Sequence, residues 1–244
     1  MKLIIRKNHY EASLWSAIYI AGRINAHNAK NKKPFVLGLP TGSSPLIIYQ
    51  ELIKLYKEKK VSFNNVHTFN MDEYIGLSKE HPQSYRYFMN EYFFNHIDID
   101  PANICFLDGM TDNVQRECML YEEMILQKGG IELFLGGMGG NGHIAFNEPG
   151  SPFDSRTRLV TLNNETIEDN SRFFDGDISK VPSAALTVGL GTIMDAREVL
   201  IIVNGKNKAK TLKKAVEGGA DEMLPVSCLH KHTNAAIVCE EGFF

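Results

Sequence analysis

The chain has 244 residues, of which 43% are hydrophobic and 23% are charged, and its formal net charge is −3. This is the composition of a globular protein that is long enough to bury a large apolar core. The lysines and arginines are dispersed, which argues against a nucleic-acid-binding surface. No apolar run reaches the roughly 18 residues of a membrane span, and the N-terminus has no stretch of signal-peptide length. We therefore expect a cytoplasmic protein without nucleic-acid or membrane partners.

Short apolar runs alternate with amphipathic segments along the whole chain. The predicted strands cover residues 3–6, 34–38, 66–71, 104–107, 132–135, 199–203 and 235–238, and the predicted helices cover 11–28, 45–57, 84–96, 113–127 and 206–217. Such alternation predicts an α/β fold of the doubly wound, Rossmann-like type, with a mostly parallel sheet and helices on both faces. Ligands of such sheets bind at the carboxyl ends of the strands. No linker or repeat interrupts the pattern, so we expect a single domain over 1–244.

The first candidate site is the segment GLPTGSSP, residues 38–45, between a predicted strand and a predicted helix. Ser44 is a suitable N-cap and Pro45 a suitable first helical residue. Free amides at the start of a helix, together with nearby hydroxyls, can bind an anion. The segment lacks the Gly-Lys-Ser/Thr ending of a Walker A loop, and an ordinary capped turn is an equally good interpretation. The candidate phosphate-binding residues are Thr41, Gly42, Ser43 and Ser44, which follow Pro40.

A pair of acids, Asp72 and Glu73, lies at the end of the predicted strand 66–71. A carboxylate at a strand end is a candidate general base for taking a proton next to a carbonyl group. The alternative is that both acids cap the next turn of the chain. The sequence alone leaves both possibilities open.

The most glycine-rich segment is GGMGGNGHIAFNEP, which follows the predicted strand 132–135. Glycine allows a backbone to approach a ligand closely or to adopt positive φ. The segment also places His143 between the amide of Asn141 and the carboxylate of Glu148. Because a catalytic histidine needs a partner that fixes its tautomer, this grouping is typical of proton transfer.

Four cations follow this loop: Arg156, Arg158, Arg172 and Lys208. Each of them could pair with a phosphate group, although a single basic residue is most often a solvated surface charge.

The cysteines and the remaining histidines show no metal-binding pattern. The four cysteines form no CxxC pair, and Cys105 and Cys239 lie in apolar runs. His230 and His232 form an HxH without a third ligand cluster. We therefore expect reduced thiols and no zinc site.

Taken together, six motifs make the chain similar to the glucosamine-6-phosphate deaminase (isomerase) family, in register from about residue 2 to residue 240. These motifs are GLPTGSSP, TFNMDEY, GHIAFNEPGS, SRTR, NSRFFDGD and ALTVGLGTIMDA. The resemblance implies conversion of glucosamine 6-phosphate into fructose 6-phosphate and ammonia, without metal or cofactor, by a cytoplasmic enzyme of amino-sugar catabolism. It implies that the phosphate contacts residues 41–44, Arg172 and Lys208.

The resemblance also implies roles for the acids and the histidine. Asp72 would move a proton between C2 and C1 of the sugar, and His143, supported by Asn141 and Glu148, would open the pyranose ring. A mobile lid is expected around residues 162–182.

Three positions depart from the pattern of the longer family members. Position 141 is Asn, where many members have Asp. Position 160 is Val, where members activated by N-acetylglucosamine 6-phosphate have Lys, although Ser151 and Arg158 match the effector pattern. The chain also ends at Phe244, before the C-terminal helix of the hexameric members. These features leave a monomer or a homo-oligomer open and predict little effector activation.

Two other functions remain as alternatives. A related sugar-phosphate lactonase would share the fold and a glycine-rich histidine loop. A non-catalytic sugar-phosphate sensor of this fold usually carries a helix-turn-helix for binding DNA, for which the chain has no room.

Overall fold

A parallel sheet of seven strands forms the centre of the molecule in this computed structural model, which describes residues 1–243. Phe244, the last residue of the predicted single domain, lies outside the described residues. Neighbouring strands pair in parallel throughout. In spatial order the strands are β1 (Lys2–Arg6), β10 (Ala235–Glu240), β9 (Val199–Val203), β6 (Leu133–Gly137), β2 (Phe35–Leu39), β3 (Val66–Asn70) and β5 (Ile104–Cys105).

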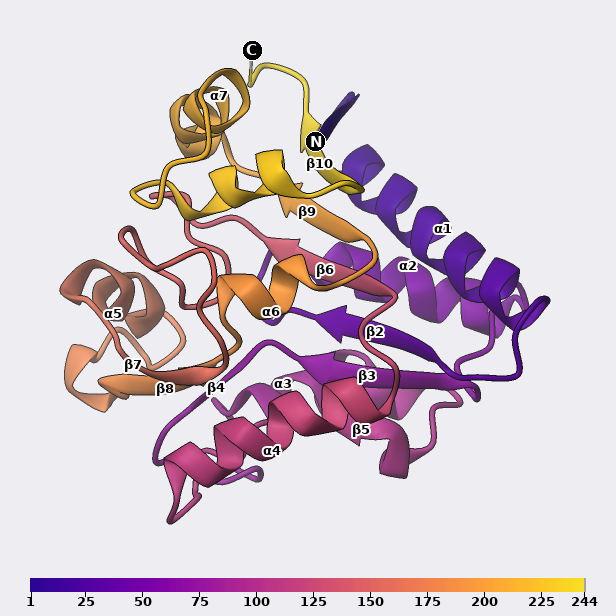
Figure 1. Cartoon of the computed structure of the whole chain (residues 1–244), viewed down its shortest axis with the longest axis horizontal. Helices are drawn as coiled ribbons and strands as arrows, with labels where there is room; N and C mark the ends of the chain where they lie inside the picture. The colour runs from indigo at the N-terminus through magenta and orange to yellow at the C-terminus, as the bar shows by residue number, and fades with distance from the viewer. Residues whose placement is uncertain (244) are drawn as a thin grey trace.

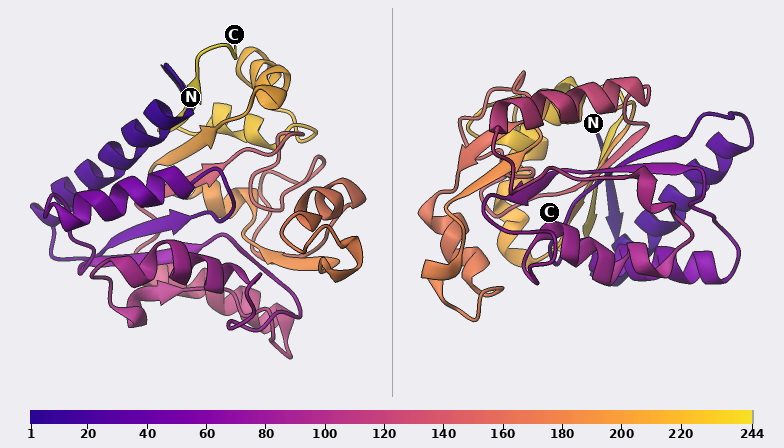
Figure 2. Two further views of the ribbon diagram at one scale, coloured as in Figure 1. Left: turned by 180° about the vertical axis from the view of Figure 1, so that it is seen from behind. Right: turned by 90° about the horizontal axis from the view of Figure 1, so that it is seen from below.

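Helices cover both faces of this sheet (Figures 1 and 2). Strands such as β9, with the sequence VLIIV, are buried at every residue, because side chains on both faces meet a helical layer. One face carries α1 (His9–Asn28), α2 (Leu46–Lys57) and α3 (Tyr85–Tyr92); the other carries α4 (Val114–Gln127), α6 (Leu190–Met194), α7 (Ala209–Glu217) and the 3₁₀ helix η5 (Pro225–Lys231). The predicted doubly wound α/β fold is confirmed.

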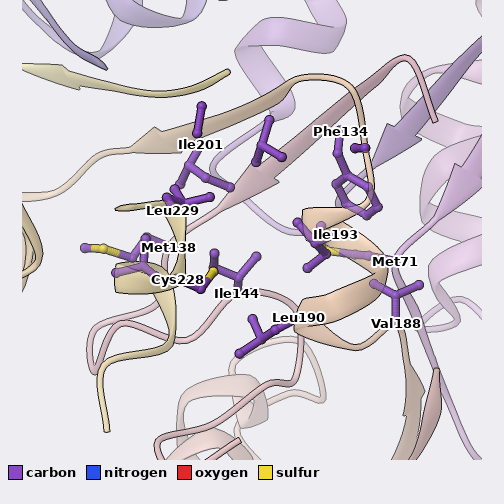
Figure 3. Close-up of a cluster of buried hydrophobic side chains, with 14 of the residues drawn as sticks. Met71, Phe134, Met138, Ile144, Val188, Leu190, Ile193, Ile201, Cys228 and Leu229 are labelled. Atoms are coloured by element: carbon purple, nitrogen blue, oxygen red, sulfur yellow. The ribbon is translucent and has the colours of Figure 1, made fainter. Parts of the chain in front are cut away.

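The larger hydrophobic core lies on the α4, α6, α7 and η5 side of the sheet. Figure 3 shows part of it, where Phe134 and Ile201 of the strands lie with Ile193 of α6. Met138 and Ile144 belong to the same core although both come from the glycine-rich segment after β6. That segment is therefore fixed to the sheet by apolar packing on both sides of its glycines.

A second sheet of three short strands was not predicted from the sequence. It consists of β4 (Asp72–Tyr74), β8 (Ala184–Thr187) and β7 (Arg158–Thr161), which pair antiparallel in that order. Strands of three or four residues carry too short a hydrophobic pattern to be recognised. This sheet supports α5 (Asn164–Ser171) and the 3₁₀ turn η3 (Ile178–Lys180), and Figure 1 shows this group beyond the carboxyl ends of β2, β6 and β9.

Several predicted bounds were wrong. The strand predicted at 104–107 has only two residues, and the helix predicted at 84–96 breaks at Phe93, which has φ −145° and ψ −62°, before the 3₁₀ turn η1 (Phe94–His96). The segment predicted as a helix from residue 206 begins with the 3₁₀ turn η4 (Lys206–Lys208). A further 3₁₀ turn, η2 (Pro101–Asn103), precedes β5.

The order of the strands reverses between β2 and β6. From β2 the chain continues outward to β3 and β5, and it then returns to β6, β9 and β10 on the other side of β2. The segments that follow β2 and β6 therefore leave the sheet in different directions and open a crevice between them. These are the two glycine-containing segments that the sequence singles out.

Candidate active site

A cavity of about 440 Å³ lies at the carboxyl ends of β2, β3, β6 and β9, and α5 with the residues after it forms its outer wall. It collects nearly all of the predicted site residues. Those that line it are Thr41, Gly42, Ser43, Ser44, Asp72, His143, Arg172 and Lys208, together with Pro40.

The segment after β2 curls at the start of α2, with Gly42 at φ +90°. The predicted cap was wrong: the helix begins at Leu46, and among the described residues no side chain caps it. Ser44 instead donates its hydroxyl to Asn204 Oδ1 at 2.7 Å. The start of α2 thus keeps amides that no side chain of the described residues caps, and residues 41–44 just before it line the cavity, an arrangement that suits an anionic ligand.

Two cations meet at the same end of the cavity. Lys208 donates from Nζ to the carbonyl oxygen of Met138 at 2.6 Å, so the lysine also holds the loop after β6. Burial lowers the pKa of Lys208, and the neighbouring guanidinium of Arg172 lowers it further. The Arg172 guanidinium lies 4.8 Å from the ring centroid of Phe173. Two neighbouring cations that line one cavity have the charge that suits a dianion.

The other two cations of the sequence prediction do not line the cavity. Arg156 pairs with Glu122 at 2.5 Å and with Asp195 at 2.6 Å. Arg158 donates to Asn147 Oδ1 at 2.8 Å and to Ser151 Oγ at 3.3 Å. Both arginines are held by neighbouring side chains, and neither lines the cavity.

Asp72 is the first residue of β4 and is only 5% exposed. Its Oδ1 is buried and has no hydrogen-bond partner within the described part of the chain. Burial raises the pKa of Asp72 well above its ordinary value, and the charge of Glu73 adds to the increase. A buried carboxylate with a free oxygen, lining a cavity, has the basicity and the access that a proton-transferring group needs.

The neighbouring acid has a different environment. Glu73 accepts hydrogen bonds from the backbone amides of Tyr74 and Tyr85 at 2.9 Å and of Arg86 at 3.0 Å. Burial raises the pKa of Glu73 to about 7 despite these three bonds. Tyr85 and Arg86 are the first residues of α3, so this carboxylate accepts hydrogen bonds from the start of a helix twelve residues further along. The alternative that both acids cap the next turn of the chain does not describe this arrangement. Glu73 is a structural residue.

His143 is held by a chain of polar contacts. Asn141 Oδ1 lies 2.8 Å from His143 Nδ1, and Asn141 Nδ2 donates to Glu148 Oε2 at 2.8 Å. Glu148 Oε1 lies 3.8 Å from His143 Nδ1, which is too far for a direct hydrogen bond. Burial lowers the pKa of His143, while the charge of Glu148 raises it and that of Lys208 lowers it. The amide of Asn141 therefore orients the ring, and the carboxylate of Glu148 supports it indirectly, through its hydrogen bond with Asn141.

At two positions of this loop, Gly139 and Gly142, the structure requires glycine. A Cβ at Gly139 would lie 2.1 Å from His143 Cε1, so only glycine leaves space for the ring. Gly142 has φ +89°, which favours glycine, and a Cβ there would lie 2.4 Å from Leu224 Cδ1. Ala145 adopts φ +52° without being glycine, a strained conformation of the kind found near functional sites.

Some residues that complete the site were missed in the sequence. Asn147 is fully buried and donates from Nδ2 to the carbonyl oxygens of Ile144 and Val188, which ties the histidine loop to the end of β8. Thr166 and Asn170, both on α5, contact Glu148 and Tyr74. Uncharged polar residues carry no distinctive pattern in a single sequence, so no signal marked them.

Through residue 243, none of the helices is long and apolar enough to cross a membrane. All four cysteines are free thiols; Cys118, Cys228 and Cys239 are buried, and Cys105 is partly exposed.

The chain matches the family model of glucosamine-6-phosphate isomerases and 6-phosphogluconolactonase over residues 12–238. A glucosamine-6-phosphate deaminase of Phocaeicola vulgatus is 56% identical over 242 residues, which are 99% of this chain and 92% of the relative. One of Parabacteroides distasonis is 55% identical over 242 residues, 99% of this chain and 90% of the relative.

Solved structures extend the comparison. A monomeric glucosamine-6-phosphate deaminase superposes with a TM-score of 0.94 at 40% identity, covering 100% of this chain and 98% of the other. The 6-phosphogluconolactonase of Thermotoga maritima has a TM-score of 0.76 at 20% identity, covering 98% of each chain, and shares the fold. With the matched model spanning most of its length and relatives of this identity, the chain belongs to the family of glucosamine-6-phosphate isomerases and 6-phosphogluconolactonases.

Proposed function

We propose that this chain catalyses the isomerising deamination of glucosamine 6-phosphate to fructose 6-phosphate and ammonia. The observation that carries the proposal is one cavity that holds a buried carboxylate with a free oxygen, Asp72, and an oriented imidazole, His143, beside a cationic end. The deaminases among the relatives, at 55% to 56% identity over nearly the whole chain, support it.

The cationic end of the cavity binds the phosphate group. Its ligands are the amides and hydroxyls of residues 41–44 and the side chains of Arg172 and Lys208. Charge-assisted bonds of this kind are strong enough to set the orientation of the sugar. The sugar carbons then lie between the segment after β6 and the start of β4.

His143 opens the pyranose ring. It takes the proton of the O1 hydroxyl and returns a proton to O5 as the C1–O5 bond breaks, which leaves an aldehyde at C1. The hydrogen bond to Asn141 fixes the ring tautomer for both transfers. The carbonyl group at C1 then acidifies the proton on C2.

Asp72 transfers this proton from C2 to C1. Removal of the C2 proton, with protonation of O1, gives an enolamine, and return of the proton to C1 gives an iminium at C2. Water then adds to C2 and the C–N bond breaks. Ammonia departs, and the product is the ketose fructose 6-phosphate. Because water supplies the new oxygen and a C–N bond is cleaved, the reaction is formally a hydrolysis. The raised pKa of Asp72 makes it a stronger base than an exposed carboxylate.

The segment 162–182 acts as a lid in this proposal. Thr166, Asn170, Arg172 and Phe174 line the cavity from this segment. Its opening admits the sugar phosphate, and its closure excludes bulk water during the enolamine step. The same proposal includes a cytoplasmic location, no metal or cofactor, and a monomer or homo-oligomer.

The test is to supply the purified protein with glucosamine 6-phosphate and to measure ammonia and fructose 6-phosphate together. Equal amounts of the two products are expected. Hydrolysis of 6-phosphogluconolactone without ammonia release from the amino sugar would favour the lactonase alternative. Binding of the sugar phosphate without turnover of either compound would favour the sensor.

A further inference from the structure

The hydroxyl of Thr166 contacts the support of the active-site histidine. Thr166 Oγ1 donates to Glu148 Oε1 at 2.6 Å, while Glu148 Oε2 accepts from Asn141 Nδ2 at 2.8 Å. Asn141 Oδ1 in turn lies 2.8 Å from His143 Nδ1. An unbroken chain of three hydrogen bonds therefore runs from α5, outside the main sheet, to the imidazole.

The chemistry of the groups sets the direction of every bond. A carboxylate only accepts, so both Thr166 Oγ1 and Asn141 Nδ2 must donate to Glu148. The amide then presents Oδ1 to the histidine, and His143 Nδ1 must carry the proton. In the neutral ring this leaves Nε2 unprotonated, as a base needs it.

Thr166 is held in place on α5. It is 7% exposed, and its backbone amide donates to the N-cap side chain of Asn163 at 2.7 Å. Ile167 of the same helix packs with Phe174 and Leu162 in a small core under the lid. The backbone of Thr166 is therefore fixed within α5, and its hydroxyl reaches Glu148 from this position.

Asn170, one helical turn further along α5, makes a second contact of the same kind. Its Nδ2 donates to the hydroxyl of Tyr74 at 2.9 Å, and Tyr74 belongs to β4, the strand that begins with Asp72. Residues four apart share one face of a helix. One face of α5 thus contacts both elements that carry the proposed catalytic groups.

We propose that Thr166 is a positioning residue, through which the seating of α5 holds Glu148 away from His143 and keeps an uncharged amide, rather than a carboxylate, on Nδ1 of the imidazole. This inference rests on the proposed function for its kinetic consequences. Glu148 Oε1 is 3.8 Å from His143 Nδ1, so a small rotation would replace the amide contact by a direct ion pair. The hydrogen bond from Thr166 occupies that oxygen and opposes the rotation.

Loss of the hydroxyl has a definite electrostatic consequence. A carboxylate closer to the ring stabilises the imidazolium and raises the pKa of His143. The other charges that act on the ring are Lys208, which lowers its pKa, and Asp169 and Glu165 of α5, which raise it. Removing an uncharged hydroxyl adds or removes none of these charges, so a shift would report a change in the positions of the charged groups around the ring, with Glu148 nearest to it.

The experiment compares Thr166→Val, which has nearly the same shape without the hydroxyl, with Thr166→Ser, which keeps it. Thr161→Val is the matched control, since Thr161 is an exposed residue of β7 just before the lid segment. For each protein, ammonia release gives kcat, KM and the pH dependence of kcat/KM. NMR titration of the His143 imidazole in the whole protein gives its pKa without reference to turnover.

For Thr166→Val we expect kcat to fall about tenfold, as for loss of a hydrogen bond to a charged group, with KM nearly unchanged. The His143 pKa and the acidic limb of the profile should both move to higher pH. Thr166→Ser and Thr161→Val should resemble the unmodified protein.

An unmoved His143 pKa in Thr166→Val would overturn the inference, whether or not the protein releases ammonia. An equal loss of kcat in Thr166→Ser would also overturn the inference, because the effect would then come from the lost methyl group and not from the hydroxyl. If Thr166→Val does not fold, Thr166→Ala provides the same comparison with less crowding. Absence of ammonia release in the unmodified protein would reject the proposed function and leave the titration as the test of the contact.

Discussion

Asp72 and Glu73 are adjacent in β4, yet the chain surrounds one carboxylate with donors and leaves the other without them. Glu73 accepts three backbone amide hydrogens, whereas Asp72 Oδ1 is buried without a partner in the described chain. Successive side chains of a strand point to opposite sides, so Glu73 faces α3 and Asp72 faces the cavity. A free carboxylate is costly to bury, and its position in a cavity indicates a use for it.

Replacement of Asp72 by Asn should leave binding of the sugar phosphate nearly intact and lower kcat by about 10²–10⁴-fold, the usual contribution of a general base. The amide keeps the size of the side chain but cannot take a proton. Glu73→Gln is the comparison, and it should lower the free energy of unfolding by about 1–3 kcal/mol, because an amide replaces an acceptor of three bonds. Deamination by Asp72→Asn at the unmodified rate would remove Asp72 from the mechanism.

Lys208→Ala and Arg172→Ala should each raise KM by about 10- to 100-fold, which corresponds to the loss of a charge-assisted bond of about 1.5–3 kcal/mol. Lys208→Ala should in addition lower kcat, because Lys208 holds the carbonyl group of Met138 in the histidine loop. The assay compares glucosamine 6-phosphate with unphosphorylated glucosamine. Variants that keep the full preference for the phosphorylated sugar would place the phosphate elsewhere.

Gly139→Ala should displace the ring of His143 and reduce kcat strongly, because the new Cβ would lie 2.1 Å from Cε1. Gly140→Ala is the control in the same loop, since a Cβ there meets nothing within 4 Å, and it should keep most of the activity. Steady-state kinetics of the two variants at one pH suffice. Similar losses in both would indicate that flexibility of the loop, rather than space for the ring, requires glycine.

Asn141→Asp should remain active and move the acidic limb of the kcat/KM profile to higher pH. A carboxylate 2.8 Å from Nδ1 would stabilise the imidazolium and raise the pKa of His143, so the neutral ring would form only at higher pH. Asn141→Ala should be less active, because the ring loses its orienting bond. An unmoved limb in Asn141→Asp together with full activity in Asn141→Ala would show that position 141 does not act through His143.

The sequence by itself determined the main sheet and the segments that end its strands. Apolar runs such as 199–203 are long, rich in β-branched residues and bounded by helical patterns, so their prediction depends only on local order. The glycine and histidine motifs after β2 and β6 could be placed at the ligand-binding edge for the same reason, because parallel strands end at one edge of the sheet.

The tertiary structure alone decided which residues act together. The three-stranded sheet places β4 and β7, which begin at positions 72 and 158, on either side of β8, and its strands are too short to have a readable pattern. Only the folded chain shows that Glu73 accepts hydrogen bonds from the start of α3, that Arg156 and Arg158 do not line the cavity, and that Thr166 reaches Glu148. These contacts depend on the direction of each side chain and on chain segments far apart in sequence, which local periodicity does not encode.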